Sequence, residues 1–576
     1  MRDRAGGLFR TKRLDEILAA AERPQHALRR ALGPVHVTLL GVGAIVGAGI
    51  FATIGTAAAG DAARPGAGPS IIVSFVITAA VCALTALCYA EMASMVPISG
   101  SAYTYSYATL GEVVAWIIGW DLIIEYAVGN VAVAISWANY FRTLLGEFGI
   151  HVPDWLSTDL RTAARIPGLF ENAPHIMGVP IVFNLLAFLI VAAVTIVLVW
   201  GIRESAAFNA VMVSIKIAVL SFFVGFAFLA VEGGQRAAHW TPFQPNGWAG
   251  TLAGAAVVFF AYIGFDAVST VAEETRHPAR DLPFGIIASL AMCTVLYIAV
   301  AAAFTTMIPY GELVQRLATE QAEPLTMALQ HAAPGSHWAL VIVAFGSVVA
   351  HTAVLLVFQL GQPRIFFSMA RDGLLPPVFA RVHPRFRTPH VTTILTGLLV
   401  GGFSAVTSIE EMVDLTNIGT LFAFVLVCAA IPVLRLRDPL RTRPFRVPLG
   451  PWLIPALGAS SCIGLMVYLP PLSWWRFIGW LALGLSIYMS YGVTRSALAG
   501  SGDARRTPPA LKISAVGFLA AAAGLFVLPH DLSPFAWLAG RGALTPRALT
   551  GLALALAGAG LGVAAGAAGL RRLARR

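Results

Sequence analysis

A succession of long apolar runs constrains the fold of this chain more than any other feature of its sequence. An apolar run of about 20 residues can cross the hydrocarbon core of a bilayer as an α-helix, and about fourteen such runs occur here. The runs are continuous and lack the short alternating segments of an outer-membrane barrel. We therefore predict an all-α integral membrane protein. Its helices are expected near residues 35–59, 69–96, 112–140, 179–200, 207–231, 248–275, 283–309, 338–369, 391–408, 412–434, 452–470, 475–494, 511–528 and 547–570.

The composition agrees with a chain that lies almost entirely in lipid. Hydrophobic residues make up 57% of the 576 residues and charged residues 12%, against roughly 25% charged in soluble domains. The longest polar stretches, 141–178 and 310–337, are too short to form a core of their own. We therefore expect the lipid bilayer as a partner and no soluble domain.

The basic residues predict the orientation in the membrane. Of the 39 Lys and Arg residues, roughly 28 fall on the side of the N-terminus and about 9 on the other side. The positive-inside rule then places both termini in the cytoplasm, with residues 1–34 as an uncleaved cytoplasmic segment. The net charge of +10 is thus a topology signal. We expect no nucleic-acid partner, because the arginines are spread over short loops.

One lysine lies inside a run that must cross lipid. Lys216 has about eight or more mostly apolar residues on each side within 208–230. A charge at this depth costs several kcal/mol unless it is paired, and such residues commonly mark ion or proton pathways. The alternative is a lysine that extends its ammonium to the membrane surface.

The first helix is predicted to be interrupted. Glycine lowers helix stability by about 1 kcal/mol, and unwound backbone exposes groups that a ligand can bind. An amino-acid carboxylate would suit N–H groups at Gly47, Ala48 and Gly49, and an ammonium would suit carbonyls near Ile45. The alternative is a glycine face for close helix packing. The four glycines of this segment are Gly41, Gly43, Gly47 and Gly49.

The sixth helix carries a matching signal. Gly264 interrupts an apolar run, and Asp266 follows two residues later. Interrupted helices in corresponding positions of two five-helix repeats are typical of a secondary transporter. Aromatic side chains that could close over a small ligand flank the break: Phe259, Phe260, Tyr262 and Phe265.

Four separated motifs, taken together, resemble one family. They are GVGAIVGAGIF (41–51), YAEMASMVPISGSAYTYSY (89–107), FFAYIGFDAVSTVAEETRHPARDLP (259–283) and GQPRIFFSMARDGLLP (361–376). They resemble the amino acid–polyamine–organocation (APC) superfamily, most closely the bacterial form of its cationic-amino-acid-transporter branch. The resemblance covers roughly residues 35–495. It implies a LeuT-type fold: ten core helices in a 5+5 inverted repeat, discontinuous helices one and six, and alternating access to a central site.

The resemblance also predicts how the chain is divided into structural regions. Residues 35–434 would form the ten-helix transport core and 435–494 helices eleven and twelve. Residues 495–576 would add two further C-terminal transmembrane helices and a basic tail, giving about fourteen helices.

Site residues follow from the same resemblance. Lys216 matches the helix-five lysine of proton-coupled bacterial members, where its ammonium resembles a substitute for a sodium ion. We add Asp266 and Glu125 as further proton-coupling candidates. For Glu125, a purely structural role, through a hydrogen bond, is an equal alternative to proton coupling. Asp372 is expected near an inner gate, and His351 is interpreted as a hydrogen-bonded interior histidine. The substrate contacts implied are Ile45, Gly47, Ala48, Gly49, Phe260, Ala261 and Ile263.

The resulting prediction is a proton-coupled L-amino-acid symporter of the cell inner membrane. An uncoupled exchanger or facilitator is the alternative, and a polytopic membrane enzyme is a third reading. The sequence holds no P-loop, H-E-x-x-H or G-x-S-x-G motif, and its five cysteines lack metal-ligand spacing. We therefore expect no catalytic residues, metal or cofactor, with the proton gradient as the driving force. The amino acid carried and any accessory subunit are left open.

Overall fold

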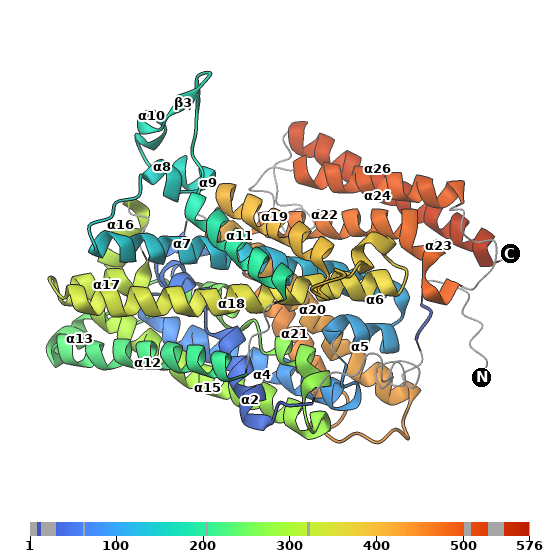
Figure 1. Cartoon of the computed structure of the whole chain (residues 1–576), viewed down its shortest axis with the longest axis horizontal. Coiled ribbons are helices and arrows are strands. Elements are labelled where there is room, and N and C mark those ends of the chain that lie inside the picture. Colours follow the sequence, from blue (N-terminus) through green and yellow to red (C-terminus); the bar gives the residue numbers. More distant parts are fainter. Residues whose placement is uncertain are drawn as a thin grey trace.

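The long helices lie side by side along the longest axis of the molecule (Figure 1). The computed structural model describes residues 9–12, 30–61, 64–98, 100–201, 206–319, 323–499, 508–527 and 546–574. Ten helices of this described part are long and apolar enough to cross a membrane, and four shorter apolar helices occupy the remaining predicted positions. The all-α membrane fold is confirmed, whereas the number of helices that cross the bilayer stays a prediction.

The first half of the core contains two helices with local irregularities. Helix one consists of α2 (Pro34–Ile45), η1 (Gly49–Thr53) and α3 (Ile54–Ala59). Helix three consists of α6 (Glu112–Ile123), a π-helical turn η3 (Ile124–Val128) and α7 (Gly129–Glu147). The other helices of this half are α4 (Ile71–Met95), α11 (Leu185–Trp200) and α12 (Ala206–Ala230).

The second half repeats the pattern, with an irregular first helix. Helix six consists of α14 (Gly247–Val258), η4 (Phe259–Tyr262) and η5 (Asp266–Glu274). The helices that follow are α15 (Pro278–Met307), α18 (His337–Arg371), α19 (His390–Val406) and α20 (Ile409–Arg437).

Short elements connect these helices. Two antiparallel hairpins pair β1 (Gly60–Asp61) with β2 (Arg64–Pro65) and β3 (His175–Ile176) with β4 (Val179–Pro180). The short helices used below are α5 (Ser101–Thr109) and α17 (Pro324–Ala332).

Helix four begins later than predicted. Residues 175–180 form the second hairpin, and the helix starts at Leu185 and not near 179. The side chain of Asn184 caps it by accepting a hydrogen bond from the Ala187 N–H at 3.1 Å. A cap of this kind satisfies an N–H group that the first turn leaves free.

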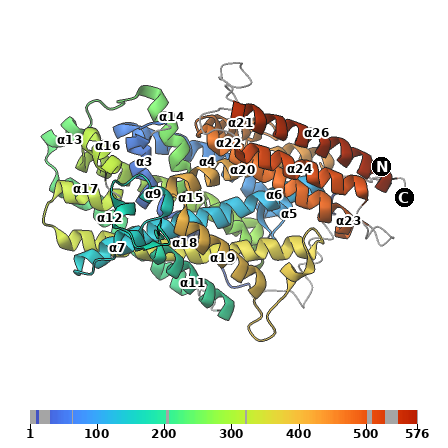
Figure 2. The same cartoon turned by 90° about the horizontal axis from the view of Figure 1, so that it is seen from above.

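The C-terminal helices stay apart from the core breaks. The long helices of this part that the structure describes are α21 (Leu453–Val467), α22 (Pro471–Ile487), α24 (Pro509–Val527) and α26 (Pro546–Ala574). The last two pack against each other, α24 also packs on α22, and both views place this pair at one edge of the molecule (Figures 1 and 2). The inner part of the bundle instead brings η1 beside η4 and α2 beside η5. Helices one and six therefore meet where each is irregular.

Candidate functional site

Helix one is interrupted between Ile45 and Gly49. Val46 has an extended backbone, with φ −77° and ψ 102°, and helical geometry resumes after it. The N–H groups of Ile50 and Phe51 both donate to the Gly47 carbonyl, at 3.2 and 3.3 Å. The first N–H groups of a resumed helix have no acceptor within it, which leaves those near Ala48 available to an anion. The predicted discontinuity of helix one is confirmed.

Lys216 holds the carbonyl side of this break. Its ammonium donates to the Gly43 carbonyl at 2.7 Å and to the Val46 carbonyl at 3.0 Å. The Tyr297 hydroxyl donates to the carbonyl between them, that of Ile45, at 2.9 Å. Lys216 is 0% exposed, so the alternative in which it extends to the membrane surface is wrong. Backbone polar groups released by the break are thus satisfied by side chains of helices five and seven.

Helix six breaks directly against helix one. Ile263 is extended, with ψ 135°, and Gly264 has φ +120°, a conformation that strains any residue with a Cβ. A Cβ on Gly264 would lie 2.9 Å from the carbonyl carbon and oxygen of Ala44. A Cβ on Gly49 would lie 2.1 Å from Ala261 Cα. Glycine therefore serves the close approach of the two helices as well as their interruption.

The predicted substrate contacts gather at these two breaks. Phe260 is 5% exposed, while Phe259 packs its ring on Phe424 with centroids 5.6 Å apart. The geometry brings the set together, and its contact with substrate stays a prediction. The set, all buried, is Ile45, Gly47, Ala48, Gly49, Phe260, Ala261 and Ile263.

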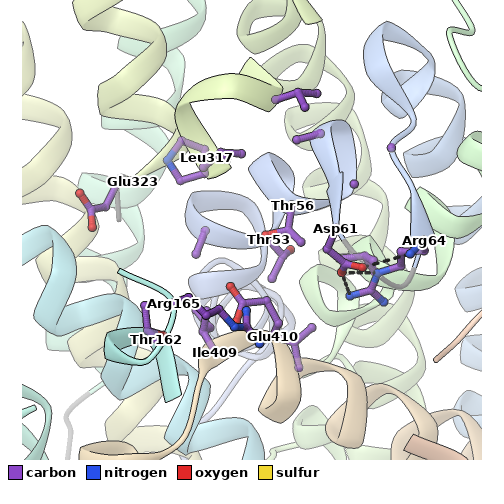
Figure 3. A pocket seen from close by; sticks show the side chains of 18 of the residues that line it. Thr53, Thr56, Asp61, Arg64, Thr162, Arg165, Leu317, Glu323, Ile409 and Glu410 are labelled. Carbon is purple, nitrogen blue, oxygen red and sulfur yellow. Dashed lines mark hydrogen bonds and ion pairs between the residues drawn. The ribbon is translucent and has the colours of Figure 1, made fainter. Parts of the chain in front are cut away.

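A cavity of about 900 Å³ approaches the breaks from one end of the bundle. Its lining includes Thr53 at the end of η1 and Val257 just before η4. Figure 3 shows Glu323 on one wall and Asp61 and Arg64 on the opposite wall, with Thr53 between them. We call this cavity the vestibule. It ends within a few residues of both breaks.

Charged groups on the vestibule wall were missed by the sequence reasoning. Arg64 binds Asp414 at 2.6 Å and Asp61 at 2.8 Å. The spacing of Asp61 and Arg64 was a signal for their pairing, but Asp414 comes from a distant helix. Burial raises the pKa of the Glu323 carboxyl, and a hydrogen bond from the Thr143 hydroxyl at 2.7 Å opposes the rise. Burial also raises the pKa of Asp159, another vestibule residue.

Ionic and hydroxyl contacts tie the other end of the bundle together. Lys12 binds one oxygen of Asp372 at 3.0 Å, and the Tyr103 hydroxyl donates to the other at 2.9 Å. Arg10 binds Glu112 at the start of helix three, at 3.3 Å. These contacts join the N-terminal segment to the ends of helices three and eight.

Two further predicted residues also meet. The Glu125 carboxyl, in η3, hydrogen-bonds the Asp266 carboxyl at the start of η5. Asp266 also accepts a hydrogen bond from the Gly264 N–H at 3.3 Å.

His351 has both ring nitrogens engaged, one with the Ser136 hydroxyl at 2.7 Å and one with the Ser347 carbonyl at 2.6 Å. The interpretation of His351 as a hydrogen-bonded interior histidine is confirmed.

An all-helical membrane bundle with helices one and six broken side by side defines a LeuT-type transporter. The chain belongs to the amino acid permease family, whose sequence model, described as "Amino acid permease", matches residues 32–490. This confirms the resemblance to the APC superfamily.

Individual relatives carry related names. The chain is 43% identical over 493 residues to the branched-chain amino acid permease BcaP of Bacillus subtilis (strain 168), covering 86% of this chain and 99% of that protein. It is 41% identical to the methylthioribose transporter of the same organism, over 85% of this chain and 99% of that protein. It is 36% identical to the vacuolar cationic amino acid transporter 4 of Arabidopsis thaliana, over 75% of this chain and 68% of that protein. The family model and the two relatives named for amino acids support amino acid transport by a multi-pass membrane protein. All three relatives are named as permeases or transporters, which points away from an enzyme.

Proposed function

We propose that this protein is a proton-coupled L-amino-acid symporter that works by alternating access. It would lie in the cell inner membrane with both termini in the cytoplasm, and its driving force would be the proton gradient. The substrate carboxylate and ammonium would bind the backbone at Ile45 and Gly47 to Gly49. Phe260, Ala261 and Ile263 would form the facing wall.

The observation that supports proton coupling is the setting of Lys216. Its buried ammonium is stabilised by the carbonyls of Gly43, in the last turn of α2, and of Val46, the residue at which the helix-one break begins. Desolvation disfavours a buried ammonium, and hydrogen bonds to these two acceptors favour its charged form. A movement of helix one that withdraws the carbonyls would release the proton. Proton release and opening of the site would thereby be linked.

The walls near the breaks support a neutral substrate over a cationic one. Ile45, Ile263 and Phe260 are apolar, and a Cβ on Gly47 would meet the side chain of Val354 at 2.7 Å. The acidic groups closest to the helix-six break, Glu125 and Asp266, are hydrogen-bonded to each other. A relative named as a branched-chain amino acid permease is consistent with this choice. We propose an aliphatic L-amino acid such as leucine.

Uptake into liposomes tests the proposal and separates the alternatives. Purified protein would be reconstituted, and radiolabelled leucine uptake measured with and without an inside-alkaline pH gradient. A symporter accumulates leucine above equilibrium only with the gradient, and a protonophore abolishes the accumulation. An exchanger takes up label only into vesicles preloaded with amino acid, and an enzyme shows no vesicle-dependent uptake. Either of the last two results would refute the proposal.

A further inference from the structure

The vestibule is lined by more acidic than basic side chains. Among the described residues, four carboxyl side chains and two guanidinium groups line it: Asp61, Asp159, Glu323, Glu410, Arg64 and Arg165. Arg64 is already bound by Asp61 at 2.8 Å and by Asp414 at 2.6 Å. A cleft in which one sign of charge prevails concentrates ions of the opposite sign. The vestibule therefore favours a positively charged group.

One wall of the vestibule carries buried acceptors that lack a donor. Glu323 is 5% exposed, and one of its oxygens accepts from the Thr143 hydroxyl at 2.7 Å. Its other oxygen, Oε1, has no hydrogen-bond partner within the described part of the chain, and neither has Asn139 Oδ1. Asn139 lies one turn before Thr143 on α7, so both side chains lie on the same face of that helix. Arg142 also attracts Glu323, but its guanidinium binds Asp154 at 3.4 Å.

These acceptors fit an ammonium group better than a metal ion. An ammonium carries three donors and no acceptor, so a carboxylate oxygen and an amide oxygen on one wall can satisfy two of its three N–H groups. A metal ion such as Ca²⁺ needs several oxygen ligands around it. In the ranges that the structure describes, no group of three or more His, Cys, Asp or Glu side chains could hold such an ion.

The same wall lies against the second half of helix one. The Tyr140 hydroxyl, next to Asn139 in α7, donates to the Phe51 carbonyl in η1 at 2.6 Å. Glu323 directly precedes α17, which packs on η1. Thr53, the last residue of η1, also lines the cavity, and Figure 3 shows it between Glu323 and the opposite wall. A ligand held by Glu323 would therefore lie beside the segment that follows the helix-one break.

We propose that Glu323 and Asn139 form an entry site, which binds the ammonium group of the incoming amino acid before the molecule reaches the two breaks. The Glu323 carboxylate supplies the charge, and the Asn139 amide oxygen supplies a second acceptor. Thr143 positions the carboxylate through its hydrogen bond. From this site the amino acid moves along η1 to the breaks. This inference rests on the proposed transport of an amino acid, and it adds a binding site whose residues are separate from those of the breaks.

Glu323→Gln tests the entry site because it removes the charge and keeps the shape of the side chain. The matched control is Glu312→Gln in α16 (Tyr310–Thr319), since Glu312 binds Arg316 at 3.0 Å and is not part of the vestibule lining. Initial leucine uptake would be measured in liposomes over a range of leucine concentrations. Glu323→Gln should raise KM about tenfold with kcat unchanged, because a charged cleft raises the rate of substrate capture by about that factor or more. Glu312→Gln should leave both constants unchanged.

A labelling experiment tests the site without transport. All five native cysteines are buried, so Asn139→Cys would place one accessible thiol in the vestibule. Its modification rate would be measured with aminoethyl methanethiosulfonate, which carries an ammonium, and with sulfonatoethyl methanethiosulfonate, which carries a sulfonate. Adding Glu323→Gln should lower the preference for the ammonium reagent about tenfold. Excess leucine should slow the labelling of Asn139→Cys.

The outcomes separate this inference from the proposed function. A wild-type KM in Glu323→Gln would overturn the entry site, as would an unchanged reagent preference in the double variant or labelling that leucine does not slow. If Asn139→Cys folds poorly, the KM comparison decides, since it needs no cysteine. A wild-type protein that fails to accumulate leucine under a pH gradient, while Glu323 still controls the reagent preference and leucine still protects the thiol, would instead refute proton-coupled symport and leave the entry site supported.

Discussion

Gly49 provides the most direct structural test of the two-break site. In Gly49→Ala, the new methyl would lie 2.1 Å from Ala261 Cα and 2.6 Å from Ala261 Cβ. Ordinary van der Waals contact at such positions begins at 3.4 Å, so η1 and η4 would have to separate. Overpacking of this kind costs about 1–3 kcal/mol. The arrangement seen here should then be populated about 5- to 150-fold less.

The apparent affinity should fall by the same factor, because substrate binds only the fraction of molecules in the competent arrangement. The assay is the concentration dependence of initial leucine uptake in liposomes with equal amounts of folded protein. Gly49→Val, with its branched side chain, should abolish uptake. Gly225→Ala in α12 is the matched control, since a Cβ there meets nothing within 4 Å. A wild-type KM in Gly49→Ala would refute the reasoning.

Three further predictions concern the wall, the substrate and the vestibule. Phe260→Ala should raise KM with little change in melting temperature. Phe259→Ala should mainly lower stability, by about 3–5 kcal/mol, because it leaves a cavity beside Phe424. Equal KM shifts in the two variants would show that the helix-six register is wrong. Excess unlabelled leucine should compete with labelled leucine much better than arginine does, and the reverse order would refute a neutral substrate. Burial raises the pKa of Glu323, so its contribution to stability is present at low pH and is lost as pH rises above the ordinary carboxyl range. Glu323→Gln should therefore weaken the fall in melting temperature over that range, and an unchanged pH dependence would contradict this assignment.

The sequence was sufficient to predict the helices and the two breaks because both depend on local composition. Apolar length determines which segments can cross lipid, and clustered glycines mark where helix one unwinds. The depth of Lys216 also followed from the run around it. Its two carbonyl acceptors did not, since a single sequence does not show which groups lie against the ammonium.

Contacts between distant segments could not be predicted in the same way. The pairing of Arg64 with Asp414 joins positions 350 residues apart. The bond between Glu125 and Asp266 likewise depends on how η3 and η5 pack. The sequence predicts Glu125 as a proton-coupling candidate, but a single sequence does not show which group faces it. Helix four began later than predicted because Asn184 caps it after the hairpin at 175–180.

The central claim is that protonation of Lys216 couples proton movement to amino acid transport. The most direct measurement is the proton flux that accompanies leucine entry into liposomes carrying an internal pH-sensitive dye, for the wild-type protein and for Lys216→Ala. The account predicts leucine-dependent acidification of the vesicle interior by the wild-type protein. In Lys216→Ala it predicts leucine counterflow without acidification. Leucine-dependent acidification by Lys216→Ala at the wild-type ratio of protons to leucine would contradict the account.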